Sequence, residues 1–362
     1  MNPDSSVHVQ ANLDPDELDA PDGPVVAGVS SAPPSAPDSA RLEAVVAVLR
    51  GARRPLLFCH RSPDGDTVGS ALALSMALQS LGSAPTVVCP DPLPRSLLFM
   101  PASGTVETTL PRDADLLVTV DISDPILLGP MRADLTRLRA GRTLLNIDHH
   151  ASDTEYGDVN LVDVSAASTA EIVYDLIGAL GVAIDRPMAT GLLTGIINDT
   201  HSFQNSNSSA RALTTAAALV GAGADPSGIS HQLLLQRRPQ AALLWGQALA
   251  TMRLDEDGRV ASAEATNLML AQCQAEVTDL DGVVEFLRGI DGVDLAFLLK
   301  PTADGDSHFK ASIRTTERVD AVELTAPFGG GGHRRAAGCD LAGPADVARD
   351  ALLRRYRELV GS

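Results

Sequence analysis

Apolar and polar positions alternate along most of the chain in a regular pattern. Four apolar runs have the length of β-strands: residues 55–60, 86–89, 115–121 and 143–148. Three stretches before or between these runs repeat apolar residues at helical spacing: residues 40–52, 65–81 and 127–139. Strands that alternate with helices at intervals of about 20–30 residues predict an α/β fold, with a parallel sheet covered by helices on both faces.

The rest of the pattern divides the chain into two domains. An edge strand over residues 158–163 and helices over 169–180, 188–197, 210–222 and 230–252 complete a first domain, residues 39–253. The sequence DEDG at 255–258 predicts a turn. A smaller α/β domain, residues 259–362, then has strands at 260–265, 295–299 and 309–314 and helices at 282–289 and 345–360. Residues 1–38 are rich in Pro, Ser, Asp and Ala, which predicts a disordered acidic tail.

Polar side chains stand where apolar segments of the first domain end. They are His60, Asp64 and Asp66, then Asp121, then Asp148, His149 and His150, and finally Asp199. Ligands of open α/β sheets bind outside the carboxyl ends of the strands. We therefore expect these side chains on one rim of the first domain.

Helix capping explains single members of this set, because Asp is common at the first position of a helix. It does not explain the whole set. Carboxylates together with imidazoles are ligands for Mn²⁺, Mg²⁺, iron or Zn²⁺. No cysteine belongs to this set of residues, which argues against thiolate-rich zinc. Several carboxylates in one place repel one another unless cations are present. Two divalent ions, bridged by one carboxylate, would resolve this and would suit phosphoryl transfer.

A glycine-rich segment in the second domain is the other candidate for chemistry. It reads GGGGHRR over residues 329–335. Alone it would indicate a flexible loop. Beside a two-metal rim it indicates a cradle for phosphate, because glycines let backbone amides approach an anion. Arg314, on a preceding strand, could add a bidentate phosphate contact. The candidates for substrate binding are Arg314, Gly330, Gly331, Gly332, His333 and Arg334.

Composition limits the partners. The net charge is −18, and residues 1–40 contain acidic but no basic side chains. Such a chain is a poor match for long nucleic acid, which binds most strongly to continuous basic surfaces. A short anionic substrate can still bind through metal ions. The four cysteines are isolated, as in reduced cytosolic proteins. No apolar run reaches the roughly 18 residues of a membrane span, and no signal peptide is evident. We expect a cytoplasmic protein.

Five motifs in this order carry a family resemblance: HRSPDGD, VDISD, IDHH, NDT and GGGGHRRAAG. Together they resemble the DHH/DHHA1 phosphoesterases over roughly residues 40–360. Within that family the chain is most similar to the two-domain bifunctional oligoribonuclease/PAP phosphatases, or nanoRNases, and to actinobacterial cyclic di-AMP and pApA phosphodiesterases. The resemblance implies a DHH domain, a DHHA1 domain and an active site in the cleft between them.

The resemblance also implies roles for the rim residues. One Mn²⁺ ion would be held by His60 and Asp64, a second by Asp66, His149 and Asp199, with Asp121 bridging the two; Mg²⁺ or Co²⁺ are alternatives. Asp148 would support the histidine pair. His150 would contact the scissile phosphate or protonate the leaving oxygen. Asp121, Asp148 and His150 are therefore the expected catalytic residues.

The implied function is metal-dependent hydrolysis of short nucleotides: nanoRNA, pApA and 3′-phosphoadenosine 5′-phosphate (PAP). Cyclic di-AMP hydrolysis as the main activity is the alternative, because it would use the same residues. A nucleotide sensor without activity should have lost metal ligands, and all six are present. The chain departs from the family pattern at Asn198, His201 and Arg334. Relatives suggest a homodimer. The preferred substrate and the roles of His201 and the tail stay open.

Overall fold

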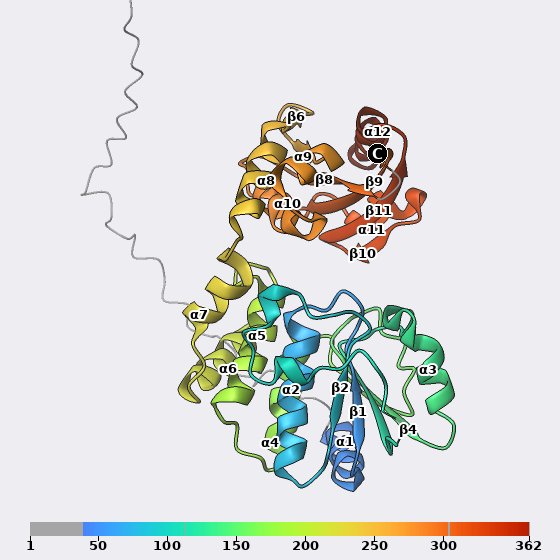
Figure 1. Cartoon of the computed structure of the whole chain (residues 1–362), viewed down its shortest axis with the longest axis vertical. Coiled ribbons are helices and arrows are strands. Elements are labelled where there is room, and N and C mark those ends of the chain that lie inside the picture. Colours follow the sequence, from blue (N-terminus) through green and yellow to red (C-terminus); the bar gives the residue numbers. More distant parts are fainter. Residues whose placement is uncertain (1–38, 112, 303–304, 362) are drawn as a thin grey trace, which may run out of the picture.

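The computed structural model describes residues 39–111, 113–302 and 305–361, with the backbone alone for Asp306 and His333. The acidic tail expected over residues 1–38 lies outside these residues. The described chain forms two β-sheets, each with helices packed on both faces, joined by a helical connection (Figure 1). The predicted α/β class is confirmed.

The first sheet has five strands, and every neighbouring pair is parallel. In spatial order they are β2 Thr86–Val88, β1 Pro55–Phe58, β3 Leu116–Val120, β4 Thr143–Asp148 and β5 Val159–Val162. All residues of β1 and β3 are buried, as expected for strands covered on both faces. The predicted strands are thus confirmed, each shorter than or equal to its expected range.

Helices cover both faces of this sheet. One face packs against α1 Ser39–Gly51, α2 Gly65–Ser80 and α4 Thr169–Ala179. A further layer, α5 Arg186–Thr200, α6 Ala210–Gly221 and α7 Pro226–Ser230, packs against these helices. The other face packs against η3 Pro125–Leu128 and α3 Met131–Leu138, and Figure 1 shows α3 on the side away from α2. Short 3₁₀ turns lie at Arg95–Leu97 (η1) and Ser103–Thr105 (η2).

Two helices of the first half differ from their expected ranges. The helix predicted over 127–139 is divided into η3 and α3, because Gly129 takes a positive φ of 52° and Pro130 follows it. The helix predicted over 188–197 begins earlier, where Asp185 Oδ1 caps it by accepting from the Met188 N–H at 3.0 Å. It also continues through Thr200, so the candidate ligand Asp199 lies in its last turn.

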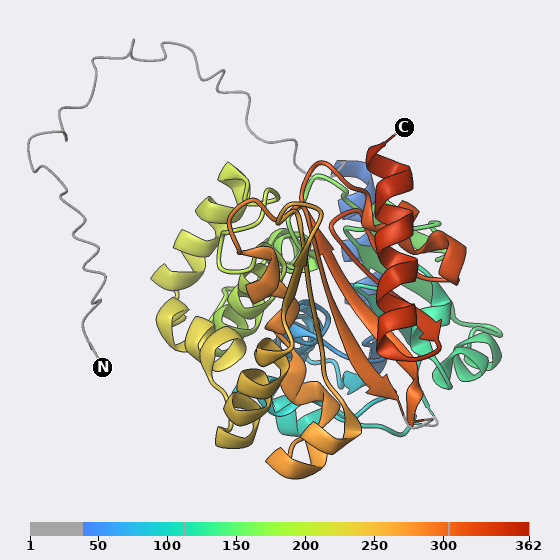
Figure 2. The same cartoon turned by 90° about the horizontal axis from the view of Figure 1, so that it is seen from above.

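The second sheet has six strands. In spatial order they are β10 Gly331–His333, β11 Ala336–Ala342, β9 Gly305–Thr315, β8 Leu295–Thr302, β7 Val260–Glu264 and β6 Arg253–Asp255. Only the β7–β8 pair is parallel. One face packs against α8 Pro239–Ala250, α9 Asn267–Cys273, η5 Val277–Leu280 and α10 Val283–Arg288. The other packs against α11 Ala321–Thr325, η6 Ala326–Phe328 and α12 Ala345–Val360, as the view from above shows for α12 (Figure 2).

The last helix of the expected first domain belongs to the second core. Leu244 and Ala248 of α8 are fully buried among residues of the second sheet, including Ala261 and Leu298. A short π-helical turn, η4 His231–Leu235, precedes α8. The expected division at residues 253–259 therefore does not match the packing, and we propose a domain boundary before Pro239. None of the described helices in either half is long and apolar enough to cross a membrane.

Sequence periodicity missed the short elements of the second half: β6, β10, β11, α9 and α11. The glycine-rich segment is the main case, because glycine has low strand propensity. Gly332 nevertheless pairs with Ala337 in the β10–β11 hairpin. A Cβ atom on Gly332, whose φ is 142°, would lie 2.4 Å from the Ala336 carbonyl oxygen, and one on Gly330 would lie 2.5 Å from that of Gly338. These two glycines are needed for the close approach of the backbones.

Candidate metal centre

His60 and Asp64 meet in the loop that joins β1 to α2. Asp64 is the N-cap of α2, and its Oδ1 accepts from the backbone N–H groups of Asp66 at 3.0 Å and Thr67 at 3.2 Å. The same oxygen lies 3.6 Å from His60 Nε2. His60 Nδ1 lies 2.8 Å from the Arg61 carbonyl oxygen, which leaves Nε2 as the nitrogen that could bind a metal ion. Capping and metal binding by Asp64 are therefore compatible.

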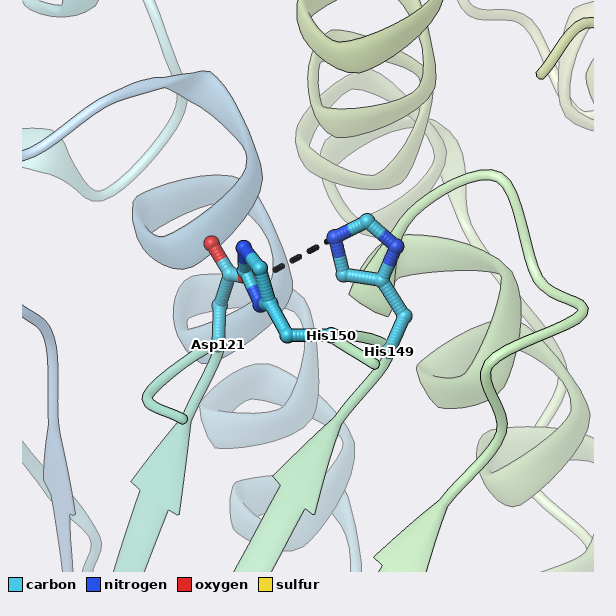
Figure 3. A group of neighbouring side chains, drawn as sticks. All are labelled: Asp121, His149 and His150. Carbon is cyan, nitrogen blue, oxygen red and sulfur yellow. Dashed lines mark ion pairs between the residues drawn. The ribbon is translucent and has the colours of Figure 1, made fainter. Parts of the chain in front are cut away.

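Asp121 stands at the centre of the histidines. It follows β3, is 3% exposed and has a positive φ of 62°, which is uncommon for a residue other than glycine. Its Oδ2 lies 3.6 Å from His60 Nε2. Its Oδ1 lies 3.6 Å from His149 Nε2 and 3.5 Å from His150 Nδ1. Figure 3 shows Asp121, at the end of β3, beside His149 and His150, which follow β4. The two carboxylate oxygens thus face different histidines, as a bridging ligand requires.

Asp148 ends β4 and orients the two histidines that follow it. Its Oδ1 accepts from the His149 backbone N–H at 2.8 Å and lies 2.7 Å from His150 Nδ1. His149 turns its Nδ1 toward the Ala166 carbonyl oxygen at 3.3 Å, and its Nε2 lies 3.2 Å from Asp199 Oδ2. The adjacent rings therefore point in different directions, with centroids 4.5 Å apart and a tilt of 59°.

Close packing of two helices brings Asp199 of α5 near Asp66 of α2. A Cβ on Gly69 would lie 2.2 Å from the Gly191 carbonyl oxygen, and one on Gly195 would lie 2.4 Å from Asp66 Oδ1. Only glycine allows this approach. The sequence analysis did not use these glycines, although their spacing at 191 and 195 places them on one face of a helix.

Donor atoms of the predicted ligands form two adjoining groups. The atoms of His60, Asp64 and Asp121 lie within 4.8 Å of one another, as do those of Asp66, His149 and Asp199. A further group joins Asp121 and His149 to His150, which the sequence analysis had not named as a ligand. The structure thus brings all six predicted ligands together in the expected partition. That they bind metal remains a prediction.

The charges of the site fit divalent cations. Burial, together with Asp199 and Asp121, raises the pKa of Asp66 well above its usual range. Burial alone would lower the pKa of His60, but Asp64 and Asp121 outweigh it and raise that pKa to about 12. The pKa of His149 is raised as well, because hydrogen bonding and charge from Asp199 outweigh burial. These pKa shifts show that the buried carboxylates favour positive charge beside them, and the nitrogen and oxygen donor set suits Mn²⁺, Mg²⁺ or Zn²⁺.

The candidates for substrate binding are spread over the second half. Arg314 lies on β9, and its guanidinium pairs with Glu285 of α10 at 2.7 Å. The Arg334 side chain is 72% exposed and lies 3.7 Å from Asp320 Oδ2. Gly329 and Gly331 both have open space where a Cβ would stand. His333 has its backbone on β10, and its side chain lies outside the described part.

His201, a departure noted in the sequence, lies between the two halves. It caps the C-terminus of α5 with a positive φ of 49°. Burial lowers the pKa of its ring, and the charges that act on it come from Glu285, Arg288 and Arg314 of the second half. Charged side chains of the second half therefore act on the end of α5 that carries Asp199.

The domains match known families in the order that the fold suggests. The profile of the DHH family, N-terminal domain, matches residues 55–196, and the profile of the DHHA1 domain matches residues 265–361. The bifunctional oligoribonuclease and PAP phosphatase NrnA of Thermus thermophilus is 34% identical over 324 residues, which cover 88% of this chain and 94% of that protein.

The chain belongs to the DHH family.

Other relatives agree with this membership. The bifunctional oligoribonuclease and PAP phosphatase NrnA of Bacillus subtilis is 25% identical over 289 residues, which cover 79% of this chain and 88% of that protein. A crystal structure of an exopolyphosphatase-related protein from Bacteroides fragilis superposes with a TM-score of 0.84, at 22% identity, over 91% of this chain and all of that one. At this identity the structural likeness shows the shared DHH fold.

Proposed function

We propose that this DHH-family protein is a two-metal phosphoesterase that hydrolyses phosphoester bonds in short nucleotides: nanoRNA, pApA and PAP. The observation that carries the proposal is the pair of donor groups around Asp121, whose two oxygens face His60 on one side and His149 on the other. The names of the relatives from Thermus and Bacillus support the substrate class.

The residues have the following roles in this proposal. His60 and Asp64 hold one ion, Asp66, His149 and Asp199 hold the other, and Asp121 bridges both. Mn²⁺ is the proposed metal, with Mg²⁺ or Co²⁺ as alternatives, because imidazole and carboxylate donors together suit these ions. Two such ions supply Lewis-acid activation of the phosphate and of the attacking water when bound.

The protein's own part in catalysis centres on His150. Asp148 holds its Nδ1 at 2.7 Å, so the opposite nitrogen, Nε2, is the one that can address the substrate. Burial lowers the pKa of His150, but Asp148 and Asp121 outweigh burial and raise it. A ring whose protonated form is favoured in this way can contact the scissile phosphate or donate the proton to the leaving oxygen.

The second half would bind the far end of the substrate. Arg314, the Gly330–Gly332 backbone, His333 and Arg334 are the proposed contacts for a distal phosphate and nucleotide, although the Gly330 N–H itself donates to the Thr325 carbonyl oxygen at 3.1 Å. The charge of Arg314 supports this assignment, because it acts on His201, and His201 caps the end of α5 that carries Asp199. The proposal also places the active site in the cleft between the halves. It includes a homodimer and a cytoplasmic location. Sedimentation analysis at several concentrations would test the dimer.

The deciding experiment compares kcat/KM with Mn²⁺ on four substrates: PAP, pApA, a five-residue RNA and cyclic di-AMP. The proposal expects the three linear substrates to exceed cyclic di-AMP by about tenfold or more. If cyclic di-AMP equals or exceeds them, second-messenger turnover becomes the main activity and the metal assignment still stands. D121A and D199A should each lose nearly all activity, and full activity in either variant would contradict the two-metal proposal.

A further inference from the structure

Thr169 contacts two of the carboxylates at the candidate metal centre. It is the first residue of α4 and is fully buried. Its backbone N–H donates to Asp66 Oδ2 at 2.7 Å, and its hydroxyl donates to Asp121 Oδ1 at 2.9 Å. The next residue, Ala170, donates its N–H to Asp66 Oδ1 at 2.9 Å. The start of α4 therefore holds carboxylates from two other elements, α2 and the end of β3.

The hydroxyl bond determines how the Asp121 carboxylate is turned. Oδ1, which accepts from Thr169, is the oxygen near His149, and Oδ2 is the oxygen near His60. A hydroxyl that donates to a carboxylate cannot donate elsewhere at the same time. Thr169 therefore favours the rotation in which each oxygen faces one of the two donor groups. Without this bond the Asp121 carboxylate could rotate so that both of its oxygens face the same donor group.

The segment that carries Thr169 is itself held in place. Asn207 donates to the carbonyl oxygens of Ala167 at 3.0 Å and of Asp199 at 3.3 Å. Arg211 donates to Asp163 Oδ2 at 2.6 Å, at the start of the segment. Ser168 occupies the N-cap position of α4 but makes no side-chain capping bond, and Asp66 instead accepts from the N–H groups of Thr169 and Ala170. Its hydroxyl is thus directed to Asp121 by a rigid backbone.

We propose that Thr169 is a positioning residue that fixes the bridging orientation of Asp121 and thereby increases the affinity of the centre for its second metal ion. This inference rests on the proposed two-metal function and adds a residue that sequence motifs do not identify. Partners that orient metal ligands typically change metal affinity or activity by roughly 10–100-fold when they are removed. Thr169 acts through Asp121 and is not assigned any contact with substrate.

The test measures Mn²⁺ binding to metal-free protein by the EPR signal of the free ion, without any assay of activity. T169V removes the hydroxyl and keeps the branched shape, and T169S keeps the hydroxyl. T215V, at a buried threonine of α6, is the matched control. T169V should bind its second ion roughly 10–100-fold more weakly than the wild type, while T169S and T215V should stay within about threefold. T169A replaces T169V if that variant does not fold.

Each outcome is decisive. Tight binding of both ions by T169V would overturn the inference, and so would equal losses in T169S and T169V, because the defect would then come from packing rather than from the hydroxyl. A wild-type protein that binds fewer than two Mn²⁺ ions would overturn the proposed function, and this inference with it. Normal wild-type binding with unchanged T169V binding would overturn the inference alone.

Discussion

His150 and Asp148 form a fixed pair at the end of β4, with His150 Nδ1 2.7 Å from Asp148 Oδ1. Asp148 is fully buried, and the same oxygen also accepts from the His149 backbone N–H at 2.8 Å. One carboxylate oxygen thus sets both the path of the chain and the orientation of the ring. The DHH sequence is a structural unit, in which the aspartate orients the histidines and need not touch a metal ion.

Asp148→Asn should reduce kcat while the number of bound Mn²⁺ ions stays at the wild-type value. An amide is neutral, so it supports a protonated His150 less well than a carboxylate does. We expect kcat to fall by roughly 10–100-fold, with KM within about threefold. Steady-state kinetics with pApA at saturating Mn²⁺ measures both. If kcat were unchanged, His150 would not need the negative charge of Asp148, and loss of bound metal would instead make Asp148 part of the ligand shell.

Asp153 introduces a pH dependence behind this pair. Burial and the neighbouring Asp148 raise the pKa of Asp153 to about 6, above the value of about 3.9 for an unfolded chain. Between these values the folded protein keeps a proton that the unfolded chain has lost. The contribution to the free energy of unfolding therefore falls as pH rises from about 4 to about 6, and it stays at the lower level above that range.

Asp153→Asn should remove this component. Relative to the wild type, the variant should gain on the order of 1 kcal/mol of unfolding free energy between pH 4 and pH 7.5, a value reduced because the side chain is partly exposed. Urea unfolding of the metal-free proteins at both pH values gives the difference, and constant effects of the substitution cancel in it. Asp291→Asn, at an exposed position, should show no such change. A difference that is independent of pH would rule out a proton held between Asp153 and Asp148.

Much of the fold and of the grouping of the candidate ligands could be predicted from sequence, because both depend on local patterns. Asp121 and Asp148 end apolar strands, and parallel strands bring their carboxyl ends to one edge. The contacts that orient the candidate ligands could not be predicted from the sequence. His149 is oriented by the main-chain oxygen of Ala166, and Asp66 by main-chain N–H groups at the start of α4. Main-chain atoms are the same in every residue, so only the fold shows which of them hydrogen-bond to the candidate ligands.

Local sequence patterns also could not predict which of the two cores α8 packs against. Its apolar residues fit the core of either half, and only the burial of Leu244 beside Ala261 assigns them to the second. The β10–β11 hairpin had a similar problem, since glycines such as Gly332 fit a flexible loop as well as a strand. In both cases the decisive information is a contact between segments that are separated in the chain.

Glu285→Gln should strengthen substrate binding. Glu285 pairs with Arg314 at 2.7 Å, and a substrate phosphate must compete with this carboxylate for the guanidinium. Both side chains are partly exposed, so the pair contributes about 0.2–1 kcal/mol, and its loss should lower KM for pApA by about two- to fivefold with kcat unchanged. Arg314→Ala should raise KM instead, and Glu43→Gln on the exposed side of α1 is the control. A higher KM in the Gln variant would mean that Glu285 orients Arg314 for the substrate.

The contact of α2 with α5 leaves no room for added atoms at Gly69. A Cβ there would lie 2.2 Å from the Gly191 carbonyl oxygen, and this atom belongs to backbone that cannot turn aside. The two helices carry Asp66 and Asp199, so their separation determines the spacing of one donor group. A small increase in that separation should therefore affect both stability and metal binding.

Gly69→Ala should lower the free energy of unfolding by about 1–3 kcal/mol, as expected for overpacking, and should weaken Mn²⁺ binding because Asp199 moves away from Asp66. Gly246→Ala is the matched control, since Gly246 lies inside α8 with open space where the Cβ would stand. That variant should be more stable by about 0.5–1 kcal/mol, because alanine favours the helix, and its Mn²⁺ binding should not change. Urea unfolding and Mn²⁺ titration measure both quantities. If Gly69→Ala were as stable as the wild type, the helices must adjust without cost; if it lost stability but bound Mn²⁺ normally, the α2–α5 spacing would not control the donor group.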